Sequence, residues 1–90
     1  MSKCLINAFL KNIYIEKGLA DNTIISYKND LKKANEIIKN KYLSDIDNYD
    51  LQKIIKFWSD NYSLKSQNRM ISSLKHFIFW LKSENYRNDN

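Results

Sequence analysis

The sequence predicts an all-α fold, a small four-helix bundle. The chain has 90 residues with no proline and one glycine, Gly18, so almost nothing in it interrupts a helix. It also lacks the Asn-Gly pairs that mark β-hairpins. Hydrophobic residues make up 43% of the chain and recur at helical spacing, which suffices for one small shared core.

The first half of the chain predicts helices over residues 3–17 and 22–40. Gly18 suits the left-handed position that ends the first helix, and Asp21 or Asn22 is expected to cap the second. The predicted core positions of the first helix are Leu5, Ile6, Phe9, Leu10, Ile13 and Tyr14. Those of the second are Ile24, Tyr27, Leu31, Ala34 and Ile38, with Tyr42 and Leu43 folding the connector down.

The second half predicts helices over residues 48–61 and 65–84. Asp47 is a good N-cap for the third, with Asp50 adding negative charge to its first turn, and Ser63 or Ser66 can cap the fourth. The predicted core positions are Leu51, Ile54, Ile55 and Trp58, followed by Ile71, Leu74, Phe77, Ile78 and Leu81. Phe79 is left open between core packing and an exposed contact. Residues 85–90 are expected to form a polar, frayed tail.

The positive charge of the chain is unevenly distributed. Fifteen Lys and Arg residues against ten acids give a net charge of +5. Residues 1–40 and 62–90 each carry a net +3, whereas residues 41–61 carry −1. The basic character therefore belongs to the second and fourth predicted helices, which indicates an anionic partner for them.

The sequence holds little that could support catalysis. Cys4 is the only cysteine, so it cannot form an internal disulfide, and it is expected to be a small hydrophobe or a frayed terminal residue. His76 is the only histidine and is expected to be a partly exposed helix residue. Neither a phosphate-binding loop nor a metal-ligand motif occurs, so we expect no enzyme activity, metal or cofactor. No apolar run approaches a membrane span, and a cytoplasmic location is expected.

Two helical faces combine cations with side chains that form hydrogen bonds, as a phosphate-contacting surface requires. The second predicted helix supplies Thr23, Ser26, Asn29, Lys32 and Lys33, and the fourth supplies Lys65, Ser66, Arg69, Ser72 and Lys75. If the two helices lie side by side, these residues form one basic wall that binds double-stranded DNA. The alternative is a helical protein-interaction module whose basic faces are incidental.

Three stretches resemble a known family. Residues 16–23 read EKGLADNT, residues 26–31 read SYKNDL, and residues 66–81 contain Arg69 and the run ISSLKHF. In this order they resemble the N-terminal core-binding (SAM-like) domain of tyrosine site-specific recombinases and phage integrases, nearest to the Xer group and its XerD branch. The likeness runs from about Phe9 to the end of the chain.

The resemblance implies a four-helix DNA clamp whose second and fourth helices meet the major groove of a recombination half-site. Strand exchange would belong to a separate C-terminal catalytic domain, and residues 85–90 would begin the linker to it. The chain would be the clamping part of a larger enzyme, excised or naturally truncated, monomeric alone and joined by other protomers on DNA. None of its tyrosines would be the nucleophile.

The positions that the resemblance carries over are Thr23, Asn29, Ser66, Arg69, Ser72 and Lys75. Three positions depart from the family pattern. Ala20 stands where a capping serine is common, and Asn29 and Lys75 stand where arginines are common. The last two replacements weaken bidentate phosphate contacts.

Overall fold

The computed structural model confirms the all-α prediction. It describes residues 2–39 and 41–87, with side chains from residue 5 onward, and no strand occurs in this part of the chain. The elements are α1 (Ser2–Ile15), α2 (Asp21–Ile37), a short 3-10 helix η1 (Leu43–Asp45), α3 (Asn48–Asn61) and α4 (Leu64–Ser83). The side chain of Cys4 and residue 40 lie outside the described residues.

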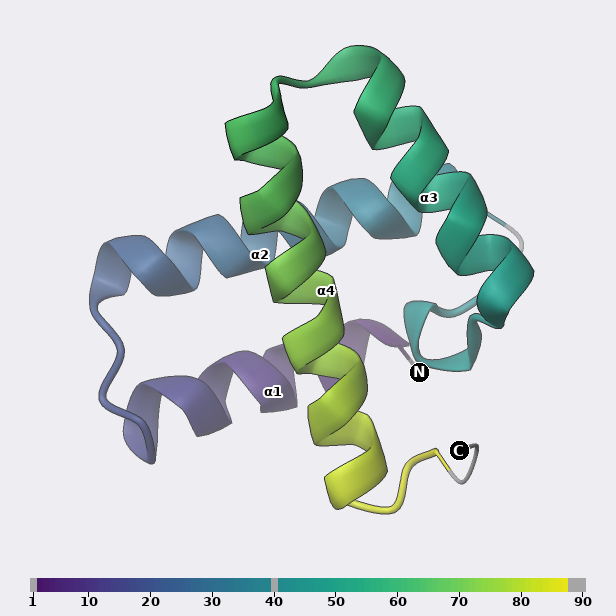
Figure 1. Ribbon diagram of the computed structural model, residues 1–90. Coiled ribbons are helices and arrows are strands. Elements are labelled where there is room, and N and C mark those ends of the chain that lie inside the picture. Colours follow the sequence, from purple (N-terminus) through teal and green to yellow (C-terminus); the bar gives the residue numbers. More distant parts are fainter. Residues whose placement is uncertain (1, 40, 88–90) are drawn as a thin grey trace.

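The helices form two layers (Figure 1). α1 and α2 lie side by side, joined at the left of the view by residues 16–20, and α4 crosses in front of both. α3 packs against α2 and α4 near the end of α2. α4 therefore contacts each of the other three α-helices.

The core is built where the apolar stripes of these helices meet. Its buried hydrophobic residues are Phe9, Leu10, Ile13, Leu31, Ala34, Ile38, Leu43, Ile46, Ile54, Trp58, Met70, Leu74, Phe77 and Leu81. Each large side chain among them contributes about 1.5–3 kcal/mol by leaving water. Tyr14 and Tyr42 were predicted to pack inward, but both are about half exposed, at 53% and 48%. Leu43 is buried as predicted, and Ile46, rather than Tyr42, joins it in closing the connector.

The caps of α3 and α4 arise from local sequence. The Asp47 carboxylate accepts the Asp50 N–H at 2.9 Å, and the Asp50 carboxylate accepts the Asp47 N–H at 3.1 Å, which is a reciprocal capping box. Lys41 adds an ion pair to Asp50 at 2.7 Å. Ser63 caps α4, because its Oγ accepts the Ser66 N–H at 3.3 Å.

The start of α2 differs from the prediction. The N-cap is Ala20, which has no side chain to offer, and Asp21 lies in the first turn rather than at the cap. The helix begins one residue early because the Ala20 carbonyl accepts the Ile24 N–H at 3.1 Å. The Asp21 carboxylate still interacts favourably with the positive end of the helix dipole.

Two helix ends also differ from expectation. α1 ends at Ile15, and Gly18 takes the left-handed conformation, with φ +63°, in the turn that follows. α2 ends at Ile37, since Ile38 leaves the helical region at φ −107° and ψ 60°.

The predicted frayed tail is ordered over residues 85–87. Asn85 adopts φ 64°, which lets the Tyr86 N–H reach the Leu81 carbonyl at 2.8 Å, as in a Schellman motif. Arg87 Nη1 then donates to the Ser44 carbonyl at 3.2 Å. The chain therefore turns back onto the connector once α4 ends.

Replacing Ser63 with alanine tests the cap of α4. We expect Ser63→Ala to lower the free energy of unfolding by about 1 kcal/mol, because the Ser66 N–H loses its acceptor. Ser63→Asp is the matched control and should keep most of the stability. Urea unfolding followed by circular dichroism measures both, and equal stability of Ser63→Ala and the parent would contradict the cap.

Candidate nucleic-acid interface

A buried carboxylate joins α2 to α4. The Asp30 side chain on α2 is fully buried, and Arg69 on α4 meets it with two bonds, Nη2 to Oδ1 at 2.8 Å and Nε to Oδ2 at 3.3 Å. Ser73, one turn further along α4, is also buried, with its Oγ 2.9 Å from Asp30 Oδ2. The Asp30 carboxylate is thereby surrounded by three donors and has no need of water.

Helical spacing explains why these donors converge. Arg69 and Ser73 are four positions apart, so they lie one above the other on the same flank of α4. Ser73 Oγ is also 3.2 Å from the Arg69 carbonyl, but its single proton goes to the carboxylate, which is the stronger acceptor. The sequence prediction missed Asp30 because its partners lie far along the chain.

Aromatic contacts continue along the same flank, one turn toward the end of α4. His76 Nδ1 lies 3.3 Å from the Tyr27 hydroxyl, and its ring meets Phe9 edge-on with centroids 5.1 Å apart. Burial, followed by the positive charge of Lys17, lowers the pKa of His76 below its ordinary 6.5. His76 is therefore a half-buried packing residue that stays neutral near pH 7, and its environment gives it no cationic role on the surface.

The outer face of α4 carries the cations predicted for it. Lys65, Ser72 and Lys75 are exposed, and neither lysine forms an ion pair with any described residue. Ser66 is half-buried and takes part in the cap, since Ser63 Oγ also donates to Ser66 Oγ at 3.2 Å. α4 itself contains no acid, so no carboxylate of this helix offsets the charge of Lys65 and Lys75.

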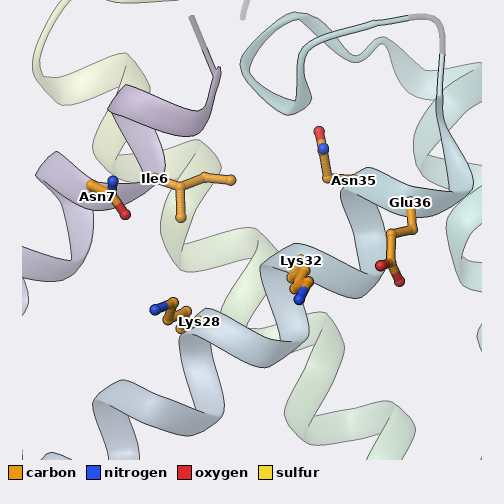
Figure 2. A pocket seen from close by; sticks show the side chains of 6 residues that line it. All are labelled: Ile6, Asn7, Lys28, Lys32, Asn35 and Glu36. Carbon is orange, nitrogen blue, oxygen red and sulfur yellow. The ribbon is translucent and has the colours of Figure 1, made fainter.

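The predicted residues of α2 divide between two sides of the molecule. Thr23 and Ser26 are half-buried and Asn29 is exposed. Lys33 lies on the side of α3, with its Nζ 5.2 Å from the centre of the ring of Tyr62, the residue that follows that helix. Lys32 instead lines a groove of about 430 Å³ between α1 and α2 (Figure 2).

That groove opens away from α4. Figure 2 shows Lys28 and Lys32 on the near side of α2, with α4 behind, whereas α4 lies in front of α2 in Figure 1. Ile6 and Asn7 of α1 line the opposite wall. Lys32 therefore lies on a different side of the molecule from the other predicted residues. The basic wall expected from the sequence does not include it.

The described residues contain no group of three or more His, Cys, Asp or Glu side chains that could hold a metal ion. No helix among them is both long and apolar enough to cross a membrane.

The sequence of the chain matches the model of one protein family. The family model for the phage integrase N-terminal SAM-like domain covers residues 6–85, so the chain belongs to this family, as its motifs indicated. Among individual relatives, the chain is similar to tyrosine recombinase XerD of Vibrio cholerae, with 36% identity over 89 residues. It is also similar to tyrosine recombinase XerD of Staphylococcus saprophyticus, with 38% identity over 86 residues.

The matches cover most of this chain but a small part of each relative. They take in 96% of the chain and 30% of the Vibrio protein, and 91% of the chain and 29% of the Staphylococcus protein. The chain therefore spans about 30% of the length of these recombinases. No solved structure matches the chain at a significant level.

Removing Arg69 tests the buried pair. We expect Arg69→Ala to lower the free energy of unfolding by about 2 kcal/mol, because Asp30 would keep only Ser73 as a partner. A fully buried pair loses about 3–5 kcal/mol when broken, and the 50% exposure of Arg69 lets water reach the site. Lys65→Ala removes an exposed cation from the same helix and should change stability by less than about 0.5 kcal/mol. Equal denaturation midpoints for both variants would contradict the structural role of the pair.

The lowered pKa of His76 makes stability depend on pH. Between the pKa of His76 in the folded protein and its ordinary 6.5, the unfolded chain binds more protons than the folded one. The free energy of unfolding should therefore fall as the pH drops below 6.5. The pKa of Asp47 is lowered from 3.8 by the hydrogen bond from the Asp50 N–H. The stability that the ionised Asp47 carboxylate contributes is therefore lost only at a more acidic pH. His76→Gln should flatten the pH dependence of stability just below pH 6.5 in denaturation series. If the pH dependence of stability persists in this variant, it arises from another titratable group.

Proposed function

We propose that this chain is the DNA-binding core-binding domain of a tyrosine site-specific recombinase or integrase. It would hold a recombination half-site through α2 and α4 while a separate C-terminal catalytic domain exchanges strands. The observation that carries the proposal is the outer face of α4, which offers cations and hydroxyls with no acid in the helix. Family membership supplies the context in which that face would meet a duplex.

The residues of this face suit a phosphate backbone. Lys65 and Lys75 supply charge without any competing ion pair among the described residues, and Ser72 supplies an exposed hydroxyl between them. On the neighbouring helix, Asn29 is exposed and Lys33 is positioned by the Tyr62 ring. Such contacts would fix the orientation of the duplex by charge and by short hydrogen bonds.

The position of Lys32 narrows the proposed surface. A duplex lying along the outer face of α4 would not reach the opposite side of α2, where Lys32 lines the α1–α2 groove (Figure 2). We therefore place Thr23, Ser26, Asn29 and Lys33 in the proposed interface of α2 and leave Lys32 outside it. In the full-length protein, neighbouring protomers would meet the domain away from the duplex.

A second candidate function rests on Phe79. Its side chain is 69% exposed on α4, so the structure excludes core packing for it. Aromatic side chains are enriched in protein–protein interfaces, so an exposed Phe79 suits a helical protein-interaction module. The two functions differ in their response to salt, because apolar docking does not release counterions.

Two matched lysine variants test DNA binding. We expect the domain to bind a short duplex at low salt, with a log–log salt slope of about −0.9 per phosphate neutralised. Lys75→Ala should make that slope shallower by about 1, whereas Lys32→Ala, with the same change of charge, should leave it unchanged. Fluorescence anisotropy at several salt concentrations gives both slopes.

NMR titration with the same duplex locates the surface. Shifts confined to residues 22–31, 33 and 65–76 that fade as salt rises would support the proposal. An absence of binding at low salt, or salt-insensitive shifts around Phe79, would favour the protein-interaction alternative.

A further inference from the structure

We infer that Asp30 is a positioning residue for base recognition: it holds the Arg69 guanidinium so that its outer edge can bond a guanine in the major groove. This inference rests on the proposed DNA-binding function and adds to it a residue that itself touches no DNA. The observation behind it is the arrangement of Asp30, Arg69 and Ser73 at the junction of α2 and α4.

The bonds to Asp30 engage one edge of the guanidinium and leave another open. Arg69 donates from Nε and Nη2, which are the two nitrogens of its inner edge. A guanidinium carries five N–H groups, so about three remain, on Nη1 and Nη2. These have no partner among the described residues, and half of the Arg69 side chain is exposed.

The support beneath Arg69 is rigid. Asp30 is fully buried, and its carboxylate is held in turn by Ser73 Oγ at 2.9 Å, so it has little freedom to move. An unsupported arginine loses rotamer entropy when it binds, whereas this one is already ordered by two bonds. The remaining donors are therefore presented in a fixed direction before any duplex arrives.

The charge of the pair indicates what Arg69 would recognise. Its positive charge is balanced by the Asp30 carboxylate 2.8 Å away, so it adds little to the long-range attraction of phosphates. Lys65 and Lys75 carry uncompensated charge on either side of it along α4. In protein–DNA interfaces, phosphate contacts position the protein, and bidentate arginine bonds to guanine O6 and N7 read the sequence. The two lysines suit the first role, and the oriented Arg69 between them suits the second.

Selection of duplexes from a random library tests the inference. We expect the parent domain to enrich a G·C pair at one position by about tenfold, the discrimination expected of one bidentate arginine contact. Asp30→Asn should remove most of that enrichment, because an amide opposes the Arg69 donors with a donor of its own. The log–log salt slope of binding should not become shallower, since the flanking lysines are intact and Arg69 loses the negative charge that balances it.

Two further variants separate positioning from folding. Ser73→Ala removes one bond from the carboxylate and keeps the ion pair, so it should reduce the enrichment in part in a domain that remains folded. Arg69→Lys keeps the charge and loses the planar edge, so it should abolish the enrichment. In NMR spectra of the folded parent, the Arg69 side-chain N–H signals should show hindered rotation, and Ser73→Ala should weaken that hindrance.

The outcomes distinguish this inference from the proposed function. If the parent domain does not bind duplex DNA, the proposed function fails first. If it binds but Asp30→Asn and Ser73→Ala keep the full G·C enrichment, Asp30 does not position Arg69 for recognition. If the parent enriches no base pair and Arg69→Ala makes the salt slope shallower by about 1, Arg69 meets a phosphate and the guanine assignment is overturned.

Discussion

The fold depends on a carboxylate that has no access to water. An ionised side chain in that position is costly unless it is paired and hydrogen-bonded, and Asp30 meets this condition only through α4. Arg69 and Ser73 satisfy it together because they lie one turn apart on one flank of the helix. If α4 were rotated or shifted by a turn along α2, the Asp30 carboxylate would be left without partners.

This requirement determines the direction of every other face of α4. With Arg69 and Ser73 toward α2, the apolar stripe of the helix turns toward the core and the exposed residues turn outward. The stripe consists of Met70, Leu74, Phe77 and Leu81, and the outward set includes Lys65, Ser72 and Lys75. The candidate DNA-binding face is thus a geometric consequence of the buried pair as well as of the charge pattern along the helix.

The sequence was sufficient wherever the determining interaction is local. The period of apolar residues predicted the burial of Phe9, Leu31 and Trp58, and the spacing of Asp47 and Asp50 predicted a helix start. These features depend on positions three or four apart, which a helix brings together whatever the rest of the chain does.

The sequence did not predict the features that depend on contacts between distant segments of the chain. Asp30 looks like an ordinary surface acid until Arg69, 39 positions away, is brought beside it. Lys32 and Lys33 are adjacent in the chain, yet one lines the α1–α2 groove and the other meets Tyr62. Which of them faces α4 depends on where α1 packs, and no local pattern contains that information.

The buried pair also gives a physical meaning to two departures from the family pattern. The resemblance implies that Asn29 and Lys75 stand at positions where the family commonly has arginine, so the proposed interface would lack two side chains able to form bidentate bonds. Lys75 preserves charge, which suffices for a phosphate, but an ammonium group has no planar edge with which to read a base. Arg69 is then the one arginine of the proposed interface, and its value depends on its orientation. A chain with a single such donor gains most from a rigid support beneath it, which is what Asp30 and Ser73 provide.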